Sequence, residues 1–307
     1  TRGRRPATRL RRRAEAARRQ GDFWGAAEQA LVARGISRGS EGLQRFWEFV
    51  DHNAQFKVLP QQHVASGQKH NRPFYPGLGC GGSGAGKTAL PRPFHEAEDY
   101  GGLATWPPDG FVALKEELLA LPKMAYHSST ASPGWGILNL RSLGRPRDFY
   151  LNHRSHMPHT AQLIAGLEAR GILAPESMSL LSQAPGTGLA HHTDCLNMVL
   201  CCHLALVVPE GEASPWIECG GERRTWTEGE FLIFDQSFVH ATDNPTSHDR
   251  VVLALDLWHY DLNYSERTAL ASFFQFVEEW NDSFGLHGPI AGVHVPYGWY
   301  TIEGESC

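Results

Sequence analysis

The chain of 307 residues has no run of about 18 apolar residues, so no part of it is predicted to span a membrane. It also lacks a CxxC pair and any zinc-type spacing among its six cysteines. We expect these cysteines to be mostly buried free thiols, which leaves the redox compartment open. With 41% hydrophobic and 20% charged residues, the composition argues against wholesale disorder, collagen and coiled coil.

Basic residues are scarce outside the first 19 positions. Residues 1–19 hold nine Arg and one Glu, a net charge of +8, whereas residues 20–307 hold 19 basic and 32 acidic residues, a net charge of −13. An acidic body does not suit a nucleic-acid surface, so no nucleic-acid partner is expected. The basic arm fits a solvated tail, the flank of a membrane anchor or the end of a transit peptide.

The chain begins at Thr1 rather than Met, so we interpret it as a fragment or a processed form. An upstream leader or membrane anchor stays open. The location stays open with it, between a membrane-anchored or ER-lumenal protein and a cytoplasmic or organellar one.

Hydrophobic spacing separates helical ends from a β-rich middle. Helical periodicity predicts helices over 14–34, 41–50, 111–121, 159–170 and 264–280. From residue 176 the period changes to two, which predicts strands over 177–184, 195–208, 215–219, 222–227, 230–235 and 250–258. Short strands separated by turn residues are typical of an antiparallel sandwich or barrel.

Shifts in composition divide the chain further. The segments are an Arg-rich arm (1–20), a helical N-terminal segment (21–58), a Pro/Gly-rich loop region (59–110), a β-barrel domain (111–262), and a C-terminal helix and tail (263–307). Two N-terminal helices are too few for a stable solenoid, so we expect them to pack on the outside of the barrel.

One segment matches the phosphate-binding loop pattern G-x-x-x-x-G-K-[ST], from Gly81 to Thr88. Such a loop joins a buried strand to a helix, whose N-terminal N–H groups hold the phosphates. The preceding stretch is not a buried strand, and Pro91 and Pro93 discourage a helix after it. A nucleotide-binding protein is therefore a minor alternative, which loss of ATP binding in Lys87→Ala would support.

Two histidines in the β-rich half form a more promising pattern. His192 belongs to a His-x-Asp motif with Asp194, and His240 follows at a distant strand end. Two His and one carboxylate are the facial ligand set of non-haem Fe(II), which leaves positions open for a co-substrate and oxygen. Arg250 begins an apolar strand, and a guanidinium aimed into a barrel needs an anion such as a carboxylate. Among 16 His, however, one His-x-Asp is unsurprising, and a single strand His more often makes only a hydrogen bond.

Several sequence blocks resemble the aspartyl/asparaginyl β-hydroxylase family. They are Pro185–Pro209, Trp226–His240, Arg250 and Asp256–His259, with a weaker upstream echo at Pro73–Leu78. The resemblance covers roughly residues 135–262 and keeps the family's order and spacing. It implies a mainly β fold, a double-stranded β-helix (a jelly-roll or cupin-like barrel), with flanking α-helices. It also implies that Fe(II), 2-oxoglutarate and O₂ are used to hydroxylate Asp or Asn side chains of a polypeptide substrate.

The resemblance assigns roles by position. His192 and His240 fall on the two iron-binding histidines, His203 on a residue that contacts the C1 carboxylate of 2-oxoglutarate, and Arg250 on the residue that pairs with its C5 carboxylate. Well-studied members have Gly at the position of Asp194. This carboxylate could be a third metal ligand or could hydrogen-bond a metal-bound water, and the sequence leaves both open.

Two further departures concern the co-substrate. The family places an Arg two residues before His203, where this chain has Cys201, and a Ser at the position of Leu181. Ser182 is one residue away, and a shift by one residue turns a side chain to the opposite face of a sheet. A catalytically weakened barrel, which binds partners through its N-terminal helices, is therefore the main alternative to an active dioxygenase.

Overall fold

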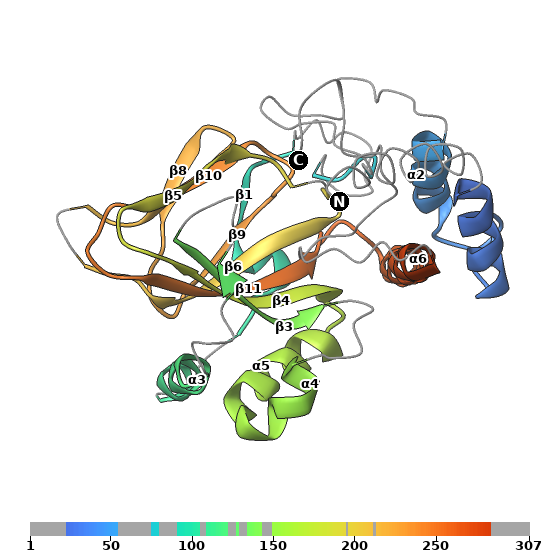
Figure 1. Cartoon of the computed structure of the whole chain (residues 1–307). Helices are drawn as coiled ribbons and strands as arrows, with labels where there is room; N and C mark the ends of the chain where they lie inside the picture. Colours follow the sequence, from blue (N-terminus) through green and yellow to red (C-terminus); the bar gives the residue numbers. More distant parts are fainter. Residues whose placement is uncertain are drawn as a thin grey trace, which may run out of the picture.

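The computed structural model describes residues 23–54, 75–79, 91–104, 109–121, 127–128, 134–142, 149–194, 196–210 and 213–283. The predicted Arg-rich arm and phosphate-loop motif lie outside these residues, as do three of the cysteines and the C-terminal tail. Two antiparallel sheets dominate the described part of the chain (Figure 1). It is therefore a mainly β protein with flanking helices, and the predicted double-stranded β-helix is confirmed.

The strands lie in the larger sheet in the order β1-β9-β6-β11-β4-β3-β2 and in the smaller sheet in the order β5-β10-β7-β8. Their bounds are β1 (Phe94–His95), β2 (His127–Ser128), β3 (Trp135–Ser142), β4 (Leu173–Gln183), β5 (Thr187–His192), β6 (Val199–Val207), β7 (Trp216–Cys219), β8 (Glu222–Thr225), β9 (Phe231–Phe234), β10 (His240–Asn244) and β11 (Arg250–Trp258).

Helices flank the sheets on two sides. They are a helix at residues 23–33, α2 (Gln44–Ala54), η2 (Ala97–Tyr100), α3 (Gly110–Leu119), α4 (Phe149–His153), η4 (Arg154–His156), α5 (Pro158–Ala169) and α6 (Tyr264–Ser283). None of the helices in the described part of the chain is long and apolar enough to cross a membrane. The predicted helices at 111–121, 159–170 and 264–280 are confirmed to within a few residues.

Five strands were not predicted, namely β1, β2, β3, β5 and β10. The sequences of β5 (TGLAHH) and β10 (HATDN) contain few of the β-branched and aromatic residues on which strand prediction depends. The smaller sheet uses these positions for polar side chains. In addition, β1 pairs with β9, so the larger sheet includes part of the segment that was predicted as loop.

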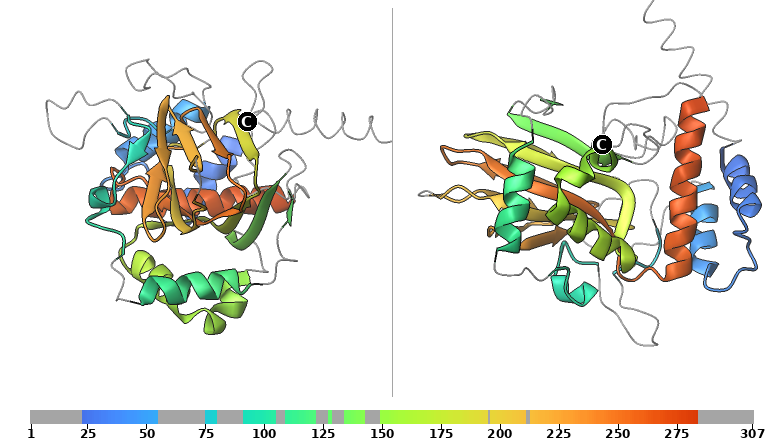
Figure 2. Two further views of the ribbon diagram at one scale, coloured as in Figure 1. Left: turned by 90° about the vertical axis from the view of Figure 1, so that its left-hand side faces the viewer. Right: turned by 90° about the horizontal axis from the view of Figure 1, so that it is seen from below.

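The two faces of the larger sheet pack against different parts of the protein. On β6 and β11, residues such as Leu204 and Leu253 face outward and pack under α3 and α5 (Figure 2). Alternate residues such as Ala205 and Val252 face the smaller sheet, where they meet Ile217. This alternation follows from the period of two in a strand. Cys201 and Cys202 accordingly contribute to opposite faces.

The helix at residues 23–33 and α2 pack against α6, outside the barrel (Figure 1). Their interface is rich in aromatic rings: Trp24 stacks on Phe273 at 5.6 Å between centroids, and Phe49 meets Phe273 edge to face at 5.5 Å. Trp258 at the end of β11 belongs to the same buried cluster. The expected packing of the N-terminal helices on the outside of the barrel is confirmed.

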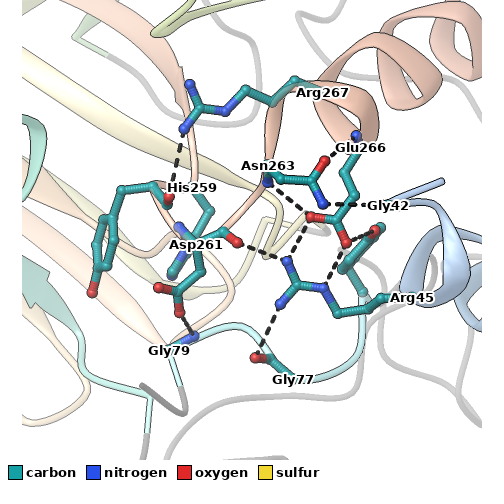
Figure 3. Close-up of polar contacts among 11 residues, drawn as sticks. Gly42, Arg45, Gly77, Gly79, His259, Asp261, Asn263, Glu266 and Arg267 are labelled. Atoms are coloured by element: carbon teal, nitrogen blue, oxygen red, sulfur yellow. Dashed lines mark hydrogen bonds and ion pairs between the residues drawn. The ribbon is translucent and has the colours of Figure 1, made fainter. Parts of the chain in front are cut away.

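A buried carboxylate joins these helices to the barrel (Figure 3). Glu266 accepts hydrogen bonds from Arg45, from the Tyr75 hydroxyl and from the Asn263 backbone, at 2.7–2.9 Å. The Asn263 side chain in turn accepts from the Glu266 N–H, which makes a capping box at the start of α6. The Tyr75 backbone exchanges two hydrogen bonds with the side chain of Asn197, just before β6.

Candidate metal centre and anion site

His192 and His240 lie side by side in the smaller sheet. They are register partners of the antiparallel pair β5–β10, and their ring centroids are 4.2 Å apart. The pairing shifts register directly after His240. Irregularities of this kind are common next to active sites, where they change the direction of a side chain. The two histidines that the sequence places 48 positions apart are therefore brought together by one strand pair.

Hydrogen bonds fix the orientation of both rings. His192 Nδ1 lies 2.7 Å from the Ala190 carbonyl, and His240 Nδ1 lies 2.9 Å from the Phe238 carbonyl. A carbonyl can only accept, so each Nδ1 carries the proton and each Nε2 keeps its lone pair. This is the arrangement in which metal-binding histidines are held by their neighbours. Burial also lowers the pKa of His240, which keeps this ring neutral at pH 7.

Asp194 completes a group of three residues that could hold a metal ion. Its backbone N–H donates to the Gln236 carbonyl at 2.9 Å, and its Oδ2 lies 3.7 Å from His240 Nε2. One ligand atom from each of His192, Asp194 and His240 lies within 4.8 Å of the others, the one such group found among the described residues. The Asp194 side chain is 56% exposed, whereas that of His240 is 5% exposed, so the group is open to solvent on the carboxylate side.

Arg250 is fully buried between the two sheets. Its Nη2 donates to Gln183 Oε1 at 2.6 Å, and its guanidinium lies 4.4 Å from the centre of the Trp226 ring. Its Nε and Nη1 have no hydrogen-bond partner in the described part of the chain. Burial lowers the pKa of Arg250 to about 9, because the charged form is poorly solvated there. Leaving a buried cation unpaired costs several kcal/mol, typically about 3–5, so the site is built for an anion.

His203 lies beside this guanidinium. Its ring stacks on Trp226 at 6.0 Å and meets Phe234 edge to face at 5.3 Å. Burial, followed by repulsion from Arg250, holds the pKa of His203 well below its ordinary value. Phe234 also lies 5.3 Å from the His240 ring, so this one side chain connects the candidate metal group with the anion site.

Three of these neighbouring residues contain buried nitrogen atoms without a hydrogen-bond partner. They are Arg250 (Nε and Nη1), Trp226 (Nε1) and His203 (Nδ1), as far as the structure is described. Buried polar groups are almost always paired, and an unpaired group calls for a missing ligand or water. A cluster that includes guanidinium and indole donors would be satisfied by carboxylate oxygens.

The sequence departures have clear structural outcomes. Cys201 faces the barrel interior, with its Sγ 3.4 Å from His203 Nε2, and burial raises the pKa of its thiol. It is therefore uncharged at pH 7 and does not replace the positive charge of an Arg. Leu181 faces the same interior cluster, and Ser182, its neighbour in the strand, alternates to the other face.

Sequence reasoning missed Gln183 as a site residue. It is fully buried and is the register partner of Arg250 between β4 and β11. The signal was available, because Gln183 stands two residues after Leu181 and must share its face of the strand. The roles of Trp226 and Phe234 as walls of the anion site were likewise not predicted, although both lie in a block that carries the family resemblance.

Comparisons with known proteins agree with this geometry. Residues 111–260 match the sequence profile described as Aspartyl/Asparaginyl beta-hydroxylase. Human aspartate beta-hydroxylase domain-containing protein 2 is 32% identical over 164 residues, which cover 49% of this chain and 43% of that protein. Aspartyl/asparaginyl beta-hydroxylase of Mus musculus is 41% identical over 86 residues, which cover 28% of this chain and 11% of that protein. The chain thus spans less than half of the length of these curated relatives.

Solved structures include a prolyl-4-hydroxylase of Pseudomonas putida, with 14% identity, a TM-score of 0.36, and coverage of 50% of this chain and 88% of that chain. HygX of Streptomyces hygroscopicus, solved with nickel and 2-oxoglutarate bound, has 12% identity and a TM-score of 0.35, and covers 50% of this chain and 79% of that chain. The sequence match is the stronger result, since it runs through every block that carries the resemblance from Pro185 to His259. On the strength of that match, residues 111–260 of this chain belong to the aspartyl/asparaginyl β-hydroxylase family.

Proposed function

We propose that this chain is an Fe(II)- and 2-oxoglutarate-dependent dioxygenase that hydroxylates a side chain, specifically an Asp or Asn of a polypeptide. The observation that carries the proposal is the fully buried Arg250 with two unpaired donors, in the same barrel as the group of His192, Asp194 and His240. A metal-binding group next to an anion site is what an enzyme needs when its co-substrate is both a metal chelator and a carboxylate.

The donor set fits iron. His192 and His240 offer Nε2 lone pairs, Asp194 offers a carboxylate oxygen, and imidazole with carboxylate suits Fe(II). We favour Asp194 as a direct ligand over a partner of a metal-bound water. Two ligand atoms that are each roughly 2.0–2.2 Å from one ion are at most about 4.4 Å apart, and the Asp194 and His240 atoms, at 3.7 Å, lie within that limit.

The anion site fits the dicarboxylate. Arg250 would pair with the distal carboxylate of 2-oxoglutarate, and His203 would contact the carboxylate next to the keto group. Trp226 and Phe234 would form the walls of this site and exclude water from it. Bound iron and 2-oxoglutarate together supply the activation of O₂ that hydroxylation of an unreactive C–H bond requires. The proposed substrate class is that named for the relatives, an aspartyl/asparaginyl beta-hydroxylase and an aspartate beta-hydroxylase domain-containing protein.

The test combines iron content with succinate formation from 2-oxoglutarate. The wild-type protein should bind one Fe(II) per chain and form succinate, and His240→Ala should lose both. His191→Ala is the matched control, because His191 adjoins His192 in β5 but is exposed and contacts Glu218. A wild-type protein that binds neither iron nor 2-oxoglutarate would overturn the proposal.

A second candidate is a weakened barrel that binds a protein partner without hydroxylating it. The uncharged Cys201 favours this candidate, because a carboxylate near the metal would lose one positive contact relative to the family pattern. In that case the protein would bind iron and 2-oxoglutarate but would form no succinate with any peptide. Restoring the charge with Cys201→Arg should then raise the affinity for 2-oxoglutarate.

A further inference from the structure

Three side chains lie in a row across the larger sheet, next to the candidate anion site. Trp135 on β3 is the register partner of Gln183 on β4, and Gln183 is the register partner of Arg250 on β11. Both Gln183 and Arg250 are fully buried. The guanidinium lies 5.3 Å from the Trp135 ring and 4.4 Å from the Trp226 ring. Gln183 is thus the neighbour that meets the guanidinium with a polar atom.

The orientation of the Gln183 amide is fixed by its second contact. Its Nε2 donates to the Thr187 carbonyl at 2.7 Å, and a carbonyl cannot donate. The nitrogen must therefore face Thr187, and Oε1 must face Arg250 Nη2, which it meets at 2.6 Å. The turn between β4 and β5 in this way sets the position of a side chain that, in turn, holds the guanidinium.

The chemistry of the amide decides what the guanidinium can still bind. An amide oxygen accepts one hydrogen bond but has no charge, so Arg250 keeps its positive charge and its Nε and Nη1 donors. A carboxylate in the same place would neutralise the guanidinium and remove its need for an anion. The preceding interior residue of β4 is the apolar Leu181, which adds no charge.

We propose that Gln183 is the positioning and specificity-determining residue for the co-substrate. It holds Arg250 in place and leaves a single positive charge, which selects a 2-oxo acid that ends in a second carboxylate over one that ends in an apolar group. This inference rests on the proposed function, because it assumes that the anion site takes a 2-oxo acid.

The test compares two ligands that differ only at the distal end. 2-Oxopentanoate has a methyl group where 2-oxoglutarate has its second carboxylate. Binding of each to the Mn(II)-loaded protein is followed without oxygen by tryptophan fluorescence, since Trp226 adjoins the site. Wild type should prefer 2-oxoglutarate. In Gln183→Glu, which has nearly the same shape, affinity for 2-oxoglutarate should fall at least about tenfold, while that for 2-oxopentanoate stays within about threefold.

A second variant separates charge from packing. Gln183→Leu removes Oε1 but keeps the positive charge of Arg250, so affinity for 2-oxoglutarate should fall several-fold while the preference over 2-oxopentanoate persists. A purely structural role of Gln183 predicts instead that both ligands lose affinity equally in both variants, and that result overturns the inference. If Gln183→Glu keeps the wild-type preference, the inference also fails while the proposed function stands. If wild type itself does not bind 2-oxoglutarate, the proposed function fails first.

Discussion

His192 on β5 and His240 on β10 face each other across one strand pair, and each ring is held by the carbonyl two residues before it. Both rings therefore present Nε2 rather than Nδ1. The strand pair sets the distance between the two rings, and the hydrogen bonds set their direction. Metal affinity should therefore depend on the geometry of the sheet as well as on the two histidines.

The first prediction concerns Asp194. If its carboxylate is a direct ligand, Asp194→Ala should weaken Fe(II) or Mn(II) binding at least about tenfold. Replacing residues that only hydrogen-bond to metal ligands already lowers metal affinity about 10–100-fold. The free energy of unfolding should change little, because the Asp194 side chain is 56% exposed. Isothermal calorimetry with the metal measures the effect, and Glu210→Ala, at an exposed carboxylate outside the site, is the control. Equal metal affinity in wild type and Asp194→Ala would exclude a ligand role.

The second prediction concerns the pH dependence of co-substrate binding. Burial lowers the pKa of Arg250 to about 9 in the unliganded protein, and only the protonated guanidinium attracts a carboxylate. The dissociation constant of 2-oxoglutarate should therefore be flat between pH 7 and 8.5 and should rise about tenfold per pH unit above pH 9. Titrations at fixed ionic strength measure it. A constant affinity up to pH 10.5 would show that Arg250 stays charged or does not contact the ligand.

The third prediction concerns the carboxylate that joins the helices to the barrel. Glu266 is buried and accepts from Arg45, Tyr75 and Asn263, so Glu266→Gln leaves the partly buried Arg45 guanidinium without its negative partner. The free energy of unfolding should fall by about 2–3 kcal/mol, toward the low end for a buried pair because Arg45 is 28% exposed. Glu28→Gln, which breaks an exposed ion pair with Arg38, should cost at most about 1 kcal/mol. Urea unfolding of both variants checks this, and equal losses would contradict it.

The fourth prediction concerns stability in acid. Burial lowers the pKa of His95 to about 4, whereas the unfolded chain takes up this proton near pH 6.5. The neutral His95 ring therefore contributes fully to the free energy of unfolding above pH 6.5. This contribution is lost as the pH falls toward 4, by about 1.4 kcal/mol per pH unit. His95→Leu should make unfolding less dependent on pH in this range. If the free energy of unfolding of His95→Leu changes with pH between 6.5 and 4 as steeply as that of wild type, His95 is not held neutral in the folded protein.

The sequence predicts the barrel well where strands bury apolar faces. β6 and β11 read as period-two apolar runs because one of their faces packs under helices and the other faces the smaller sheet. The prediction from the sequence fails at β5 and β10, because these strands carry polar side chains in place of an apolar face. For Gln183, the spacing from Leu181 indicates the interior face of β4. The sequence does not show which residue it meets there, because only the register between β4 and β11 places it beside Arg250.

The candidate metal residues could be named from the sequence, because His192, Asp194 and His240 stand out as chemistry in a β-rich context. The sequence pattern also indicates Arg250 as an anion-binding candidate, and the resemblance adds His203 and a role for each of the two residues. What no pattern could supply is the set of unpaired nitrogens of Arg250, His203 and Trp226, which exists only once β6, β11 and the segment between β8 and β9 are packed together. Those atoms are the strongest physical reason to expect an anionic ligand.

The most direct measurement is an oxygen-free calorimetric titration of 2-oxoglutarate into the Fe(II)-loaded protein, repeated with Arg250→Met and with metal-free protein. Under the proposed function, binding of 2-oxoglutarate needs both the metal group and the Arg250 guanidinium. Saturable binding of one equivalent to the Fe(II)-loaded wild type is therefore expected, with strongly weakened binding in the other two samples. Absence of binding to the Fe(II)-loaded wild type, or equal binding in all three samples, would contradict it.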